Sequence, residues 1–333
     1  MGLIETLARK ASLAPRRLVL PEGEDPRIVR AAGAIAQRGW AKVTLLGDPE
    51  TVRAVARAQQ APLAGVTITG TSELVEPTRA ALLEARGERI DGARALEEAR
   101  RVTMQAAYLV RAGRADAFVA GATHATSDVL RAAIFLIGTA RGVRTVASYF
   151  AMVKTEPGGK ERVLFFADGG VVPDPDAAQL ADIAISTADR FRALVGLEPH
   201  VAMLSFSTKG SAKHPHADKV IEATARARAL RPDLHIDGEM QADAALVPEV
   251  AAKKAPGSVV AGHANVLIFP DLDAANIGYK LVQRLGGWAA YGPILSGLAK
   301  PANDLSRGCS AEDVETVSLF ALAGADVQAG VSG

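Results

Sequence analysis

The sequence predicts an α/β protein with mostly parallel sheets, on the basis of three observations. Short apolar runs alternate along the chain with Ala-rich stretches of helical period, which is typical of βαβ units. These runs are apolar throughout, as expected for strands that are covered on both faces. At 333 residues the chain is longer than one hydrophobic core usually grows, so two domains are expected.

The expected elements follow one another in a regular order. A strand in "RRLVLPE" precedes a helix in "DPRIVRAAGAIAQRG", for which Asp25 suits the N-cap, Pro26 the first turn and Gly39 the C-terminal end. A second strand follows in "AKVTLLGD". Later strands are expected in "ADAFVAGAT", "RVLFFADGG", "HVAMLSFST", "LHIDGEM", "ANVLIFPD" and "AAYGPILSG". The least regular stretch, "AMVKTEPGGKERV" at 151–163, is interpreted as a hairpin turn or an irregular connection.

Composition narrows the class of protein. A hydrophobic fraction of 49% and a charged fraction of 23% are those of an ordinary globular chain. The net charge of +1 provides no overall field for nucleic acid or an acidic membrane, so any anion site must be local. One cysteine excludes an intramolecular disulfide. The N-terminus has no apolar core of a secretory signal, and no run of about 18 apolar residues predicts a membrane span. A cytoplasmic protein is therefore expected.

Several common site motifs are absent from the sequence. No GxGxxG follows the first strand, and there is no GxxxxGK[ST] phosphate loop. No HExxH or CxxC suggests zinc, and His214 and His216 are interpreted as loop histidines, so no metal site is expected.

Polar residues at the ends of predicted strands are the first candidates for a site, because open α/β sheets bind ligands there. Ser207, Thr208 and Lys209 lie in "SFSTKGSAKH", after a predicted buried strand. Hydroxyls, backbone N–H groups and Lys209 or Lys213 could hold a phosphate at a helix N-terminus. A solvated loop explains the same residues equally well.

Arg131, in "GATHATSDVLRAA", is expected near the start of a helix, just past the end of a strand. A cation placed there opposes the helix dipole, which suggests an anionic partner. An ion pair with Asp128 is the alternative.

The stretch "LAKPANDLSRGCSAEDV", residues 298–314, carries the most chemistry. Ser310 and Asp313 resemble a capping box for the helix that follows. Capping leaves five polar or small residues unexplained: Asn303, Asp304, Ser306, Arg307 and Gly308. A guanidinium can hold a phosphate, a serine hydroxyl can donate to an oxyanion and a carboxylate can accept a proton. These groups suit transfer between a phosphate and an acyl acceptor.

Long blocks of the sequence resemble the phosphate acetyltransferase (phosphotransacetylase) family: "LPEGEDPRIVRAA", "SFSTKGSAK", "DGEMQADAALVP", "KAPGSVVAGHANVLIFPDLDAANIGYKLVQRL" and "AYGPILSGLAKPANDLSRGCSAEDV". The resemblance implies reversible conversion of acetyl-CoA and phosphate into CoA and acetyl phosphate. It implies coenzyme A as a substrate and no permanently bound cofactor. It also implies a homodimer, with no nucleic-acid or membrane partner.

The same resemblance implies a two-domain, three-layer αβα fold like that of the isocitrate and isopropylmalate dehydrogenases. Residues 1–143 and 293–333 would form the first domain, completed by the C-terminal segment, and residues 144–292 the second. The active site is expected in the cleft between them.

Site residues also follow from the resemblance. Ser306 and Arg307 of "DLSRG" correspond to the catalytic pair, and Asp313 to the proposed base. The expected CoA- and phosphate-binding residues are Arg27 of "EDPR", Arg86 of "LLEAR", Arg131 of "SDVLR", Ser207, Thr208, Lys209 and Asn303. Arg89 lies close to Arg86 and is the alternative to it. The implied mechanism is direct attack of the CoA thiolate in a ternary complex.

Alternatives remain open from the sequence. Cys309 could form a covalent acetyl-cysteine, but no histidine lies near it to generate a thiolate. The related fold suggests a dehydrogenase with Asp237 and Asp271 as metal ligands. An acyl-CoA-sensing module without turnover and an enzyme for longer acyl chains are the other two hypotheses.

Overall fold

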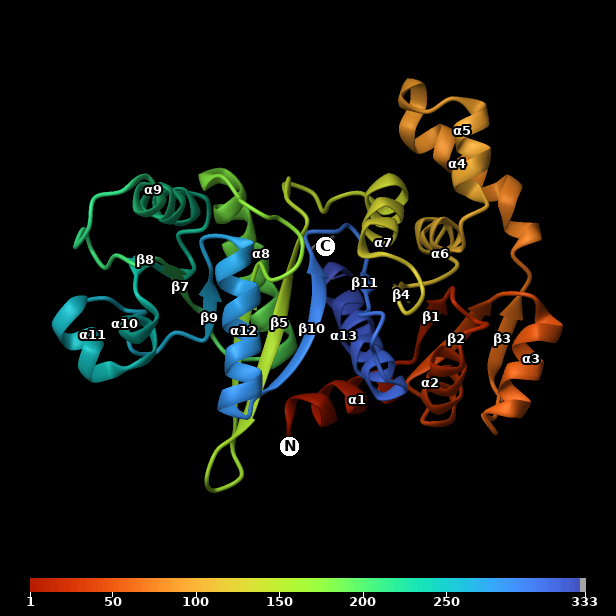
Figure 1. Cartoon of the computed structure of the whole chain (residues 1–333), viewed down its shortest axis with the longest axis horizontal. Helices are drawn as coiled ribbons and strands as arrows, with labels where there is room; N and C mark the ends of the chain where they lie inside the picture. The colour runs from red at the N-terminus through yellow and green to blue at the C-terminus, as the bar shows by residue number, and fades with distance from the viewer. Residues whose placement is uncertain (330–333) are drawn as a thin grey trace. The chain divides into compact units, whose positions relative to one another are not determined.

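The computed structural model describes residues 1–329, which form two compact units of α/β structure (Figure 1). Unit 1 comprises Met1–Arg141 and Leu298–Gly333, and unit 2 comprises Gly142–Gly297. Residues 330–333 of the expected first domain lie outside the described residues. Within residues 1–329, no helix is both long and apolar enough to span a bilayer.

The sheet of unit 1 is parallel throughout, as predicted. Its strand order is β11-β4-β1-β2-β3. The strands are β1 (Arg16–Leu20), β2 (Ala41–Leu46), β3 (Val66–Thr69), β4 (Ala117–Ala120) and β11 (Ala302–Asp304). All of β4 is buried, which agrees with a strand covered on both faces. The strands β3 and β11 were not predicted.

Helices cover both faces of this sheet. The last helix, α13 (Ala311–Ala329), packs on α1 (Leu3–Leu13) and α2 (Pro26–Gln37), so the first and last helices of the chain lie side by side in unit 1 (Figure 1). The connection after β3 runs back past β2 and β1 to β4, and α6 and α7 lie on the other face of the sheet from α2 and α13 (Figure 1). The other helices are α3 (Pro49–Ala58), α4 (Val75–Arg86), α5 (Gly92–Ala99), α6 (Val102–Arg111) and α7 (Thr126–Ala132), with short 3₁₀-helices at Ser72–Leu74 and Gly87–Arg89 and a π-helix at Ala133–Ile137.

The start of α2 confirms its predicted caps. Asp25 is the N-cap, and its carboxylate accepts a hydrogen bond from the backbone amide of Arg27 at 2.8 Å. Pro26 occupies the first turn, where no amide hydrogen is required. Gly39 follows the helix with a φ of +67°, a conformation that glycine adopts without strain.

The sheet of unit 2 is mixed, with the order β10-β5-β6-β9-β7-β8. Pairing is parallel from β6 to β8 and antiparallel for β10–β5 and β5–β6. The strands are β5 (Ala147–Thr155), β6 (Glu161–Ala167), β7 (His200–Leu204), β8 (His235–Met240), β9 (Val266–Ile268) and β10 (Ala289–Ser296). Of the two interpretations of 151–163, the hairpin is confirmed, because the short connection 156–160 permits only antiparallel pairing.

Neighbouring side chains of β5 pack on opposite faces of this sheet. Tyr149 stacks on Phe165 with ring centroids 4.5 Å apart, and Phe165 meets the edge of Phe191 in α8 (Ala177–Val195). Phe150 points the other way and stacks on Tyr279 of α12 (Leu272–Gly286) at 3.8 Å. The remaining helices of the unit are α9 (Pro215–Leu230), α10 (Ala242–Leu246) and α11 (Pro248–Lys254).

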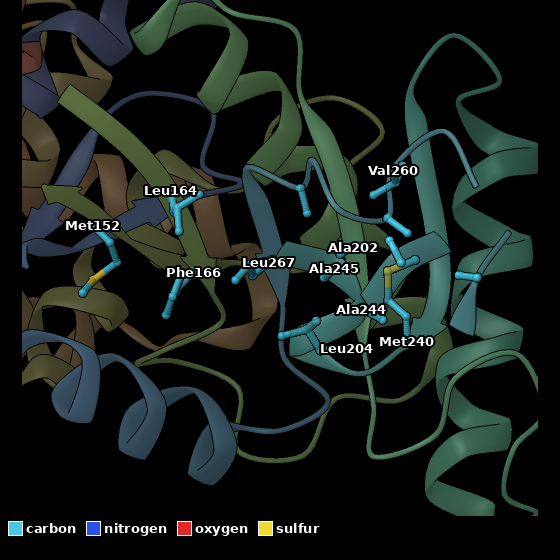
Figure 2. Packing of buried hydrophobic residues seen from close by; sticks show 14 of the residues in the cluster. Met152, Leu164, Phe166, Ala202, Leu204, Met240, Ala244, Ala245, Val260 and Leu267 are labelled. Carbon is cyan, nitrogen blue, oxygen red and sulfur yellow. The ribbon is translucent and has the colours of Figure 1, made fainter. Parts of the chain in front are cut away.

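The core on the α12 side of unit 2 consists mainly of aliphatic and alanine side chains (Figure 2). Strands β5, β6, β7, β8 and β9 contribute residues to it, together with α10 and α11. The side chains labelled in the figure are Met152, Leu164, Phe166, Ala202, Leu204, Met240, Ala244, Ala245, Val260 and Leu267. Small alanines let the helices approach the sheet closely, which compensates for an aromatic content of only 5%.

Candidate active site

The loop 305–310 connects β11 to α13 in unit 1. It forms a tight turn, in which the Cys309 amide donates to the Ser306 carbonyl at 2.9 Å and the Gly308 amide donates to Ser306 Oγ at 3.2 Å. Ser306 and Arg307 are exposed, while Cys309 is buried. Because Ser306 Oγ accepts this bond, its own O–H remains available as a donor. A hydroxyl and a guanidinium thus face solvent beyond the carboxyl end of a parallel strand, where α/β proteins bind ligands.

A capping box begins α13, as predicted. The Ser310 amide donates to Asp313 Oδ2 at 2.8 Å, and the Asp313 amide donates to Ser310 Oγ at 3.1 Å. Asp313 is exposed. Its capping function is therefore established by geometry, while its role as a base stays a prediction.

Arg27 lies against the same loop. Its guanidinium donates to the Asp25 carboxylate and to the backbone carbonyls of Arg307, Cys309 and Ala122. The structure thus brings Arg27 together with the Ser306–Cys309 turn. The guanidinium contacts backbone carbonyls of this turn and does not line an open site for an anion.

Glu22 is a buried carboxylate at the end of β1 that the sequence did not single out. It accepts hydrogen bonds from the backbone amides of residues 121–124, at 2.8–3.0 Å, and from the side chains of Thr123 and His124. Burial by itself raises the pKa of Glu22, but the bonds from His124, Thr123 and Ala122 outweigh it and lower the pKa. The bond to Glu22 raises the pKa of His124. Glu22 therefore ties the end of β1 to the loop after β4.

Two polar residues at the end of β11, Asn303 and Asp304, are each only 2% exposed. Asp304 Oδ2 accepts a hydrogen bond from Thr126 Oγ1 at 2.6 Å, while Oδ1 makes no hydrogen bond within the described residues. Gly121 makes room for this carboxyl, since a Cβ there would lie 2.4 Å from Oδ1. Burial, with a smaller contribution from the charge of Glu22, raises the pKa of Asp304 to about 6. A role for Asn303 in substrate binding stays a prediction.

Replacing Asp304 by asparagine should stabilise the protein above pH 6. The folded-state pKa lies above the ordinary 3.8, so the native state loses stability as pH rises through that interval and the acid ionises. Asparagine removes that penalty, and the free energy of unfolding should increase by about 1–3 kcal/mol at pH 8. Urea denaturation of both proteins at pH 4, 6 and 8 measures the difference. An equal change at pH 4 and pH 8 would contradict the titration of Asp304.

A cavity of about 480 Å³ lies at the carboxyl ends of β1 and β2. Its lining includes Glu22, Glu24, Asp25 and His124. With three carboxylates in its wall, this cavity is unfavourable for phosphate groups.

Arg131 lies in the last turn of α7, not near the helix start as expected. The helix begins earlier, at Thr126, and continues after Ala132 as the π-helix Ala133–Ile137, so the guanidinium lies along the helix and not at its N-terminus. It lies 3.6 Å from Glu98 and 3.8 Å from Asp128, and the predicted ion pair with Asp128 is thus present.

Arg86 ends α4, and its guanidinium lies 4.3 Å from the ring centroid of Phe135. Arg89 lies in the following short turn and is exposed. The choice between these two arginines as the functional one stays a prediction.

The loop after β7, in unit 2, was expected to bind an anion. Its Ser207 and Lys209 side chains instead form hydrogen bonds to carboxylates of the protein itself. Ser207 Oγ donates to Glu239 at 2.8 Å, and Lys209 Nζ donates to Asp237 at 2.5 Å. Thr208 Oγ1 accepts from the backbone amide of Gln241. These bonds explain the loop as a structural element, and substrate binding by Ser207, Thr208 and Lys209 stays a prediction.

Comparison with known proteins places the chain among the α/β acyltransferases. A family model described as phosphate acetyl/butaryl transferase matches residues 2–323. A phosphate acetyltransferase of Acetivibrio thermocellus is 46% identical over 324 residues, 96% of this chain and 97% of the relative. One of Paracoccus denitrificans is 46% identical over 315 residues, 94% and 96% of the two chains.

Solved structures agree. A phosphotransacetylase from Streptococcus pyogenes superposes with a TM-score of 0.92 at 41% identity, covering 98% of this chain and 99% of that chain. The EutD phosphotransacetylase from Staphylococcus aureus gives 0.89 at 40% identity, covering 97% and 98%. The chain belongs to the phosphate acetyl/butaryl transferase family, which confirms the resemblance seen in its sequence.

Proposed function

We propose that this protein is a phosphate acetyltransferase, which transfers an acetyl group reversibly between coenzyme A and phosphate. The observation that carries the proposal is the turn that exposes Ser306 and Arg307 beyond β11, within the region matched by the family. Two relatives that are 46% identical to this chain over nearly its full length are named phosphate acetyltransferases. Coenzyme A is then a substrate and not a resident cofactor.

The mechanism that we propose is direct transfer in a ternary complex. Asp313 accepts the proton of the CoA thiol, and the thiolate sulfur forms a bond to the carbonyl carbon of acetyl phosphate. The C–O bond to phosphate breaks, and phosphate leaves with the electron pair. Ser306 donates its free O–H to the developing oxyanion, and Arg307 holds the departing phosphate.

One assay tests the function and separates the alternatives. CoA and acetyl phosphate should yield acetyl-CoA, followed by absorbance of the thioester, and the rate should be compared with propionyl and butyryl phosphate. Faster turnover of a longer acyl phosphate would favour a longer-chain phosphate acyltransferase. Tight binding of acetyl-CoA without turnover would favour a sensing module.

Replacing Asp313 by asparagine separates its role as a base from its role as a cap. The side-chain carbonyl of asparagine can still accept the hydrogen bond from the Ser310 amide, so the melting temperature should change by only a few degrees. If Asp313 accepts the thiol proton, kcat should fall by about 10²–10⁴-fold. Steady-state kinetics together with thermal melting measures both effects. Normal turnover in the folded variant would show that Asp313 acts only as a helix cap and not as a base.

The geometry gives no support to an acetyl-cysteine intermediate. Cys309 is 6% exposed, and burial raises its pKa above the ordinary 9.0. A protonated, buried thiol is a poor nucleophile.

The proposed assembly is a homodimer, and its proposed location is the cytoplasm, where its substrates occur. In unit 2, α12 exposes Ile277, Leu281 and Leu285 at a spacing of four residues, with 52–83% of each residue accessible. Such an apolar stripe suits burial against a second copy. Light scattering should give a mass of twice 34.6 kDa. The relation to the dehydrogenase fold and the site between the expected domains stay predictions.

A further inference from the structure

The guanidinium of Arg27 lies where three segments of unit 1 meet. Nε and Nη2 donate to the two oxygens of Asp25 at 3.0 and 2.8 Å, at the N-terminus of α2. Nη1 donates to the carbonyl oxygens of Arg307 at 2.7 Å and Cys309 at 3.1 Å. Nη2 also donates to the carbonyl oxygen of Ala122, in the loop after β4, at 2.9 Å.

These five bonds use all the N–H groups of the side chain. A guanidinium has five donors in a rigid fork and no acceptor. Each donor has a partner within the protein, and the Asp25 carboxylate neutralises the charge. No donor therefore remains for a phosphate of coenzyme A or for the phosphate substrate, unless a contact to the protein is first broken.

The contacts to Arg307 and Cys309 flank Gly308. Glycine gives the backbone more freedom than any other residue, so this turn needs an external restraint to keep one conformation. Two carbonyls held by a single fixed guanidinium supply that restraint. The orientation of the Ser306 and Arg307 side chains follows from the backbone that is held in this way.

We propose that Arg27 is a positioning residue, which fixes the backbone of the loop 305–310 so that Ser306 and Arg307 meet the substrates, and that it does not itself bind coenzyme A or phosphate. This inference rests on the proposed function of Ser306 and Arg307. It replaces the ligand role that was expected for Arg27 from the sequence.

Cys309 allows a test that does not depend on activity. It is the only cysteine of the chain, so a thiol reagent reports on one site. It is buried inside the loop, with Sγ 3.8 Å from Nη1 of Arg27. Loosening of the loop should expose it to 5,5′-dithiobis(2-nitrobenzoic acid).

The experiment compares Arg27→Ala and Arg27→Lys with Arg30→Ala, which removes an exposed arginine from the same helix. For Arg27→Ala we expect kcat to fall about 10–100-fold, with KM for CoA and phosphate within about threefold of the native value. Labelling of Cys309 should accelerate about 10–100-fold. Lysine keeps the charge but cannot span three segments, so Arg27→Lys should lie in between. Arg30→Ala should match the native protein in all three measurements.

In Arg27→Ala, loosening of the loop should speed the labelling of Cys309, whereas loss of the positive charge should slow it. The charge of Arg27 lowers the pKa of the Cys309 thiol, so removing it makes the thiol less acidic and, by itself, slower to react. Faster labelling therefore reports an opened loop. Arg27→Lys covers the case in which Arg27→Ala does not fold.

Two results would overturn the inference. A raised KM for CoA or phosphate, with unchanged kcat and unchanged labelling, would make Arg27 a ligand. Unchanged kinetics and unchanged labelling in both Arg27 variants would leave it without a positioning role. If the native protein shows no acetyl transfer, the proposed function fails, whereas labelling still decides whether Arg27 holds the loop.

Discussion

Replacing Arg307 by alanine is expected to reduce kcat for acetyl transfer by about 10²–10³-fold or more, with little change in thermal stability. The guanidinium is exposed, and within residues 1–329 it makes no hydrogen bond or ion pair, so folding does not depend on it. Its removal leaves the departing phosphate without a bidentate partner. Ser306→Ala should lose about 10²–10³-fold in kcat, the usual cost of one oxyanion donor.

Arg307→Lys provides the matched control for charge. Lysine supplies a cation without the planar fork, so its kcat should lie between those of the native protein and the alanine variant. Kinetics with acetyl phosphate and CoA, with the melting temperature of each variant, measures the effects. Near-normal turnover in either alanine variant would remove that residue from the proposed mechanism.

Replacing Glu22 by alanine should destabilise the protein by about 3–5 kcal/mol. The carboxylate is the acceptor for the four backbone amides of residues 121–124 and for the side chains of Thr123 and His124. Alanine leaves the buried amides of Gly121 and Ala122 without an acceptor, each at a cost of about 1–3 kcal/mol before relaxation and hydration. Urea denaturation at pH 7 measures the change. Glu24→Ala is the matched control, because Glu24 is exposed and accepts one bond, from the Asp48 amide.

The same site should show a defined dependence on pH. Because the pKa of Glu22 is lowered, its contribution to the free energy of unfolding is present above pH 4.5, its ordinary pKa. That contribution is lost as the pH falls through the folded-state pKa. Because the pKa of His124 is raised, its contribution to the free energy of unfolding is present below pH 6.5, its ordinary pKa. That contribution is lost as the pH rises through the folded-state pKa. A Glu22→Ala variant that loses no more stability than Glu24→Ala would contradict this role.

Local patterns in the sequence predicted local structure well. The caps of α2 and α13 involve residues within a few positions of one another, so Asp25, Pro26, Ser310 and Asp313 specify them directly. Three strands were not predicted: β3, β5 and β11. The strands β3 and β11 are short, whereas β5 (Ala147–Thr155) overlaps the stretch 151–163 that was interpreted as a hairpin turn or an irregular connection. β11 consists of Ala302, Asn303 and Asp304, residue types that disfavour strands, and its pairing with β4 outweighs that preference.

Contacts distant in sequence account for what could not be predicted. Arg27 and Arg307 are 280 positions apart, and no pattern near "EDPR" shows that its donors are already used. Glu22 lies about 100 positions from the amides that donate hydrogen bonds to it, so its burial and its pKa depend on the tertiary fold. The prediction that Arg131 lies near the start of a helix was wrong, because α7 already begins at Thr126.

The order of segments along the chain has a consequence for synthesis. Unit 2 is continuous in sequence, whereas unit 1 lacks β11 and α13 until the ribosome has made the residues after Leu298. Until then the edge of β4 is unpaired, and the parts of α1, α2 and β4 that α13 covers are exposed, which is the kind of surface that chaperones protect. The same late segment carries Ser306 and Arg307. A nascent chain therefore acquires the turn that carries Ser306 and Arg307 only with the segment that completes unit 1.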